Sequence, residues 1–111
     1  MRFCIVHRAR GSLAFQLALN DGRAALTGPP QRDLDACMRT IRDLVTALRQ
    51  GAGVVRTARP GRHRFAFTDD AGTVLATSVP RSTAAAADDL LRELQQWAAA
   101  EMQLRITFPP E

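Results

Sequence analysis

The sequence contains no lysine, so all 15 of its basic side chains are arginines. They outnumber the 11 acidic residues and give the chain a formal net charge of +4. Arginine pairs well with phosphate and carboxylate groups, which makes a nucleic-acid partner one interpretation of this excess. The abundance of alanine beside arginine equally indicates a codon bias toward both residues. The charge by itself therefore does not define a function.

The sequence also lacks an apolar run of the roughly 18 residues that a membrane-spanning helix requires. Its N-terminal segment, MRFCIVHRAR, has four consecutive apolar residues before charge follows, which is too short for the core of a signal peptide. We therefore expect a cytoplasmic protein with no membrane partner. A length of 111 residues suffices for a single domain with one modest core.

Only two cysteines are present, Cys4 and Cys37, and they are too far apart in the sequence for a CxxC motif. The residues around them form no pattern typical of a zinc site. We therefore expect no metal site, and we expect both thiols to be buried, reduced and structural.

What the sequence does contain is an internal similarity at a shift of 50 positions, without any gap. The matched pairs include Gly11 with Gly61, Phe15 with Phe65, Gly22 with Gly72, Thr27 with Thr77, Pro30 with Pro80, and Ile5 with Val55. Glycines, a proline and apolar residues are the positions that a shared backbone would require. The pattern predicts a tandem duplication, with a first repeat at 1–52 and a second at 53–111.

Each repeat has the same order of secondary-structure signals. The first copy predicts strands at 2–6, 13–19 and 23–27, then a helix that begins after Asp33 as N-cap and ends at Gly51. The second copy predicts strands at 54–57, 63–67 and 73–78, a helix opening at Ser82 or Thr83, and a short edge strand at 104–108. We expect an α+β fold of two β-β-β-α repeats, with an antiparallel sheet and two helices packed on one of its faces.

The second copy carries the motif GTVLATSVPRS, residues 72–82, after a D-x-G turn and before an amphipathic helix. This pattern resembles the YegP-like family of small tandem-repeat proteins of unknown function. The first copy is degenerate, with Gly28 in place of the motif serine and Arg32 or Asp33 in place of the helix-opening Ser or Thr. The chain also lacks the lysines and the Asn-Gly pair within the helix that the family usually carries. The resemblance implies a compact α+β fold and no assigned reaction.

Residues for catalysis are not evident in this pattern. His7 and His63 do not fall at equivalent positions of the two repeats, and Asp69 and Asp70 lie in a turn signal, where aspartate bonds its own backbone. A catalytic site requires a nucleophile or a paired acid and base held in geometry. We expect no enzyme activity, no catalytic residue and no cofactor.

A basic patch is the first candidate binding surface. It consists of six arginines near two turns: Arg8, Arg10, Arg56, Arg59, Arg62 and Arg64. Strand alternation turns Phe65 and Phe67 inward with His63, and it turns Arg62 and Arg64 to the face away from the helices. Nucleic-acid binding without sequence preference also uses exposed aromatic platforms, which these buried phenylalanines do not supply. The favoured interpretation is a solvated hairpin tip, and the alternative is contact with a phosphate backbone.

A dimer face is the second candidate. Apolar residues on the face away from the helices need cover, which a second copy of the same face would provide. The candidate residues are Val6, Val54, Ala66 and Leu75. The sequence thus predicts a small, non-catalytic binding or protein-interaction module that forms a homodimer or contacts a protein partner. Arginine-mediated binding of nucleic acid is the alternative function.

Overall fold

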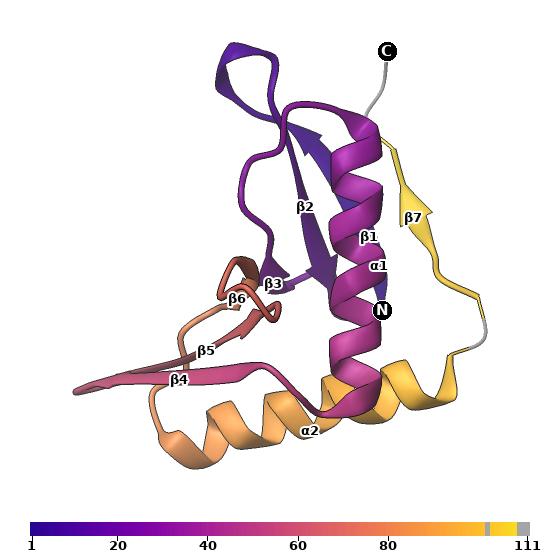
Figure 1. Ribbon diagram of the computed structural model, residues 1–111. Helices are drawn as coiled ribbons and strands as arrows, with labels where there is room; N and C mark the ends of the chain where they lie inside the picture. The colour runs from indigo at the N-terminus through magenta and orange to yellow at the C-terminus, as the bar shows by residue number, and fades with distance from the viewer. Residues whose placement is uncertain (102, 109–111) are drawn as a thin grey trace.

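The computed structural model of the protein describes residues 1–101 and 103–108. Its elements follow the order β-β-β-α twice and then end in a short strand (Figure 1). They are β1 (Arg2–His7), β2 (Leu13–Ala18), β3 (Ala24–Thr27), α1 (Leu34–Gln50), β4 (Val54–Arg59), β5 (Arg62–Thr68), β6 (Val74–Ser78), α2 (Ala84–Ala100) and β7 (Ile106–Thr107). A single 3₁₀ turn, η1 (Ala9–Gly11), connects β1 to β2. Each strand and helix predicted from the sequence is present. The last strand, predicted at 104–108, is shorter in the structure, where it spans Ile106–Thr107.

The strands form one sheet in the order β4-β5-β6-β3-β2-β1-β7. All neighbours pair antiparallel except β1 and β7, which are parallel. The sheet is therefore mixed, and the expectation of a wholly antiparallel sheet is wrong at this edge. A hairpin forces two strands to be antiparallel, but β7 follows a helix, so its direction is not constrained in that way. Its predicted position at a sheet edge is confirmed.

The helices begin and end at side chains suited to those positions. The Asp33 side chain accepts a hydrogen bond from the Ala36 amide at 2.8 Å, and Thr83 does the same for Ala86 at 3.1 Å. Gly51 ends α1 in the left-handed conformation, with φ of 67°, which costs glycine little. These contacts confirm the predicted N-cap and C-cap of α1. No helix of the described residues is long and apolar enough to cross a membrane.

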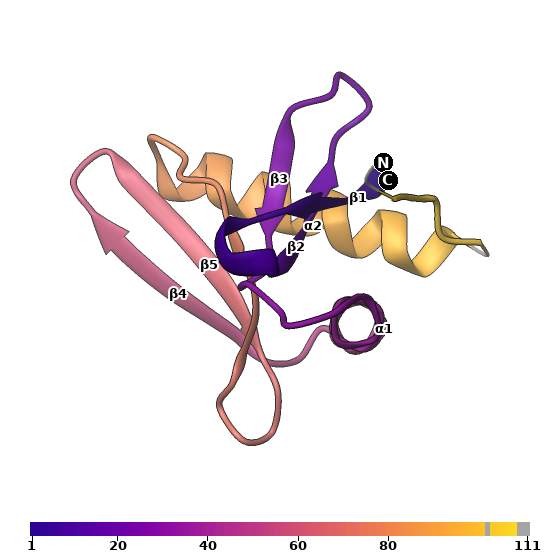
Figure 2. The same ribbon diagram turned by 90° about the horizontal axis from the view of Figure 1, so that it is seen from above.

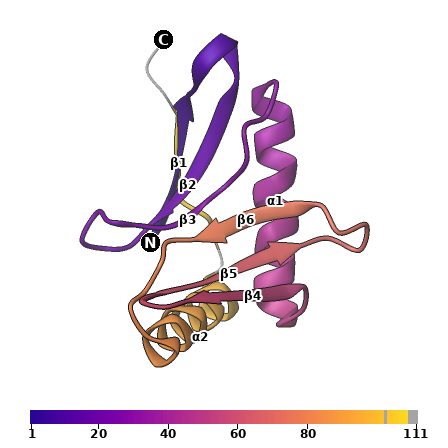
Figure 3. The ribbon, with the colours of Figure 1, turned by 90° about the vertical axis from the view of Figure 1, so that its left-hand side faces the viewer.

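Both helices pack on one side of the twisted sheet; in the view of Figure 3, α1 passes behind β5 and β6, and α2 lies below β4. α1 contacts β2 and β6, α2 contacts β5, and the helices contact each other. The core between the layers is built around four fully buried phenylalanines: Phe3, Phe15, Phe65 and Phe67. Phe3 meets Phe15 edge to face, with 5.7 Å between ring centroids. The sheet surface opposite the helices is called the outer face below.

Candidate functional site

The outer face of the β4–β5 hairpin carries a concentration of positive charge. Phe65 and Phe67 are buried against the helices, so Arg64 and Ala66 point to the opposite side because successive side chains of a strand alternate. In the pairing register, Arg59 lies opposite Arg62, and Thr57 lies opposite Arg64. The prediction that Arg62 and Arg64 face away from the helices is confirmed.

These side chains surround a hollow of about 450 Å³, lined by Thr57, Arg59, Arg62 and Arg64. We call the three arginines the hairpin triad. Figure 2, which looks down on the molecule from above, shows the β4–β5 hairpin projecting beyond the rest of the sheet. Arg59 and Arg62 are exposed, and Arg64 is half-buried.

The hairpin triad has no negative counterpart within the described residues. The ion pairs among the described residues all involve other arginines: Arg23 with Asp21, Arg32 with Asp33, Arg56 with Asp88, and Arg92 with Asp89. Like charges directly opposite each other on paired strands are destabilising, and Arg59 and Arg62 are such a pair. The Nε of Arg64 is in addition shielded from solvent without any acceptor. The triad therefore presents donors and positive charge that an anion could satisfy.

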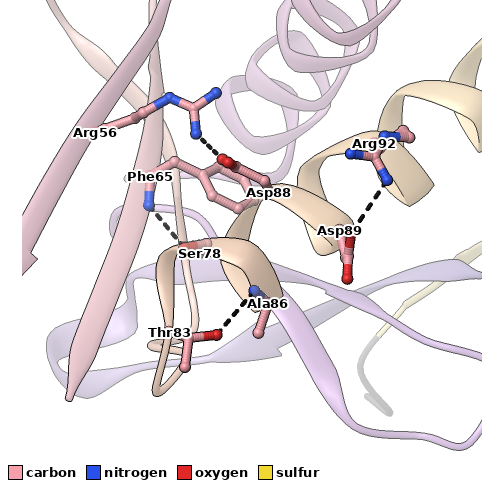
Figure 4. Close-up of polar contacts among 8 residues, drawn as sticks. All are labelled: Arg56, Phe65, Ser78, Thr83, Ala86, Asp88, Asp89 and Arg92. Carbon is pink, nitrogen blue, oxygen red and sulfur yellow. Dashed lines mark hydrogen bonds and ion pairs between the residues drawn. The ribbon is translucent and has the colours of Figure 1, made fainter.

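The other three predicted patch residues lie elsewhere. Arg8 and Arg10 sit at η1, on the β1–β2 connection, which is well separated from the β4–β5 tip in Figures 1 and 3. Arg56 lies on the helix side of β4, where it pairs with Asp88 of α2 (Figure 4). The six arginines are thus divided among three places. The triad lines the hollow on the outer face, and Arg56 lines a separate hollow on the helix side, beside Asp88.

The position of Arg56 follows from a register that the sequence comparison missed. Ile5 pairs with Phe15 in the first half, whereas Arg56, and not Val55, pairs with the equivalent Phe65 in the second. The connection is one residue shorter in the second half: residues 8–12 separate His7 from Leu13, but only 59–62 separate the corresponding pair, Ala58 and His63. A slip of one residue exchanges the two faces of a strand. The gapless match of Ile5 with Val55 is therefore wrong.

The slip in β4 and a bulge in β6 both change the predicted dimer face. Val54 packs against the core on the helix side, because it pairs with buried Phe67. Leu75 is 5% exposed and belongs to the core, since a bulge opposite the Phe67–Thr68 step interrupts the alternation of β6.

Val6 and Ala66 remain half-buried on the outer face. They lie on β1 and β5, which three other strands separate. The four residues do not form one surface, and the homodimer stays a prediction.

The titratable and thiol groups of the described residues do not gather into a reaction centre. Among residues 1–101 and 103–108, no three His, Cys, Asp or Glu side chains are placed to hold a metal ion. Cys37 is buried and free, and its burial, helped by the nearby Asp33 charge, raises the pKa of its thiol. Cys4 is also free but half-buried on β1, so the prediction of a buried thiol is confirmed for Cys37 alone.

Thr57 lines the hollow and was not among the predicted site residues. A signal for it was present in the sequence. The Pro60-Gly61 dipeptide is a two-residue turn, and such a turn makes its flanking residues, Arg59 and Arg62, a cross-strand pair. Counting back from that pair places Thr57 opposite Arg64 and on the same face.

Neither a family model nor a curated protein matches this sequence. The solution NMR structure of UPF0339 protein SO3888 from Shewanella oneidensis matches with a TM-score of 0.85 at 17% identity, over 96% of this chain and 89% of that one. The solution NMR structure of YegP, a protein of unknown function from E. coli, matches with a TM-score of 0.82 at 14% identity, over 99% and 95% of the two chains. The resemblance to YegP-like proteins is confirmed as a common α+β fold. Neither structure supplies an activity for this chain.

Proposed function

We propose that this chain is a small, non-catalytic binding module that engages an anionic partner through the hairpin triad. The observation that carries the proposal is the unpaired state of Arg59, Arg62 and Arg64 among the described residues. Three guanidinium groups around one hollow repel one another, and an anion would convert that repulsion into charge-assisted hydrogen bonds. Bonds of this kind are stronger than those between neutral groups.

We also propose that the fold is a tandem duplication. The helices α1 (Leu34–Gln50) and α2 (Ala84–Ala100) start 50 residues apart, and so do their N-caps. Two isolated bridges recur at the same spacing, Leu13 with Gln31 and His63 with Arg81. In this scheme the triad is a feature that the second repeat has and the first lacks.

The proposal is tested with two fluorescent polyanions, an oligoglutamate and a mixed-sequence oligonucleotide, by anisotropy at low and high salt. We expect at least one to bind at low salt and to dissociate as salt rises, because exposed charges are screened. The variant with Arg59→Gln, Arg62→Gln and Arg64→Gln should bind about tenfold more weakly or worse, which corresponds to roughly 1.4 kcal/mol.

A matched control removes the same number of charges elsewhere. It carries Arg8→Gln, Arg10→Gln and Arg39→Gln, all exposed arginines outside the hairpin triad. This control should bind nearly as well as the wild type. Equal losses in the two triple variants would mean that only net charge matters and would overturn the proposal. So would failure of both probes to bind at low salt.

A further inference from the structure

Strand β4 is a long open edge of the sheet. It ends the strand order, and its six residues pair with β5 in continuous register. Five of the six are exposed, among them Val55 at 49%. Such an edge presents unpaired backbone groups and is a template for another strand unless something blocks it. β4 itself contains neither proline nor a bulge, so its arginines are its protection.

The hydrogen bonds of β5 define which backbone groups of β4 are free. The amides of His63 and Phe65 donate toward the β6 side, to the Arg81 carbonyl and the Ser78 hydroxyl. The Thr68 amide donates the other way, to the Gly53 carbonyl at 2.8 Å. Backbone groups alternate in direction along an antiparallel strand. The amides and carbonyls of Val54, Arg56 and Ala58 therefore point away from β5, toward the open edge.

The other half of the sheet shows an added strand at the corresponding edge. Phe3 on β1 pairs with Leu17 as Val54 on β4 pairs with Phe67. Along β1 the edge is covered by β7, and the Phe3 amide donates to the Arg105 carbonyl at 2.8 Å. No strand of the described residues covers β4 in this way. The fold thus holds an edge strand in one half and leaves the equivalent edge open in the other.

Charge selects the occupant of the open edge. Pairing β4 with β4 of a second copy would place two hairpin triads side by side on one face. Among the described residues no carboxylate pairs with the triad, so the two sets of arginines would repel each other. A nucleic acid would profit from aromatic stacking, but the exposed aromatic residue Phe108 lies at the β7 end of the sheet, opposite to β4. An extended acidic peptide would supply backbone hydrogen-bond partners for β4 and carboxylates for the arginines.

We propose that an extended acidic segment of a partner protein adds to β4 as an eighth strand, with its carboxylates on the outer face against the hairpin triad. This inference rests on the proposed function and names its ligand. Side chains of the added strand that point to the outer face would lie directly beside Thr57 and Arg59. Arg62 and Arg64 would lie one strand further, within reach of long side chains because strands are about 4.8 Å apart.

The test separates backbone pairing from charge. The probe is an eight-residue peptide of alternating threonine and glutamate, compared with the same peptide N-methylated at alternate amides. In the protein, Ala58→Pro removes one edge amide but no bond to β5, and Ala58→Val is the control that keeps the amide. We expect N-methylation and Ala58→Pro each to weaken binding of the peptide about tenfold, and Ala58→Val to leave it unchanged. Hydrogen exchange should slow at the amides of Val54, Arg56 and Ala58 when the peptide is bound.

The outcomes distinguish this inference from the proposed function. If the triad variant loses the peptide while N-methylation and Ala58→Pro change nothing, the triad binds anions but strand addition is wrong. The N-methylated peptide keeps this result decisive even if Ala58→Pro does not fold. If the oligonucleotide binds more tightly than the peptide, or if light scattering shows a dimer through β4, the acidic-peptide occupant is wrong. If no polyanion binds, both proposals fail.

Discussion

The two edge hairpins of the sheet differ more than their common plan suggests. In β1, Phe3 and Ile5 are 0% and 2% exposed and belong to the core, and β7 pairs with the edge of the strand at Phe3 and Cys4. In β4, the corresponding residues are Val54, which is half-buried, and Arg56, which is exposed. The edge strand β1 therefore contributes more to the core than β4 does, and β4 leaves its outward backbone groups and its charges exposed. The edge proposed above for binding thus lies on the edge strand that the core needs less.

The largest expected effect is at the first residue pair of this comparison. Phe3→Ala removes a fully buried ring that contacts Phe15 and Trp97, and it should lower the free energy of unfolding by about 3–5 kcal/mol. Val54→Ala removes two methyl groups from a half-buried site and should cost about 1 kcal/mol or less. Chemical denaturation of both variants measures the difference. Equal losses would contradict the difference between β1, an edge strand that stabilises the core, and β4, an edge strand that the core needs less.

The sequence was sufficient for the elements of the fold because their signals are local. Asp33 and Gly51 mark the two ends of α1 through capping contacts that are common to helices. The turns at Gly22 and Gly72 are equally local, because glycine readily adopts their positive φ angles. The inward direction of Phe65 and Phe67 followed from strand alternation, and so did the outward direction of Arg62 and Arg64.

What could not be predicted depends on pairing between distant segments. The parallel direction of β7 is set by the path of the chain after α2, and no residue within β7 encodes it. The bulge in β6, which turns Leu75 into the core, and a similar bulge in β3 interrupt an alternation that the sequence alone presents as regular. The slip in β4 was concealed because a gapless alignment matched Ile5 with Val55, two residues of similar shape on opposite faces. The position of Arg56 on the helix side followed from that slip.

A second expected effect concerns position 28 and its counterpart 78. Gly28 lies beneath the Phe15 ring, since a Cβ built on it would come within 2.6 Å of Phe15 Cζ. Ser78 instead accepts a hydrogen bond from the Phe65 amide at 2.9 Å, as Figure 4 shows. Gly28→Ser should displace the ring and cost about 1–3 kcal/mol of unfolding free energy, although it restores the residue of the second half.

Ser78→Ala is the reciprocal change. It leaves the buried Phe65 amide without an acceptor and should also cost about 1–3 kcal/mol. Thermal or chemical denaturation of the two variants tests whether each half requires its own residue. Were Gly28→Ser neutral, the Phe15 ring would be free to move aside, and the two halves would be interchangeable at this position.

The smallest expected effect is at the position of Ile5 and Arg56. Arg56 pairs with Asp88, but the two side chains are 58% and 46% exposed, so solvent and salt weaken the pair. Arg56→Ala and Asp88→Ala should each change the unfolding free energy by less than about 1 kcal/mol, and a double-mutant cycle should give a coupling of roughly 0.2–1 kcal/mol that falls with added salt. Ile5→Ala, at the buried counterpart, should cost about 2–5 kcal/mol and be insensitive to salt. A strong, salt-independent coupling between Arg56 and Asp88 would show that β4 is fixed to α2 as firmly as β1 is fixed to the core. That result would contradict the proposal that the edge of β4 is free to pair with a partner.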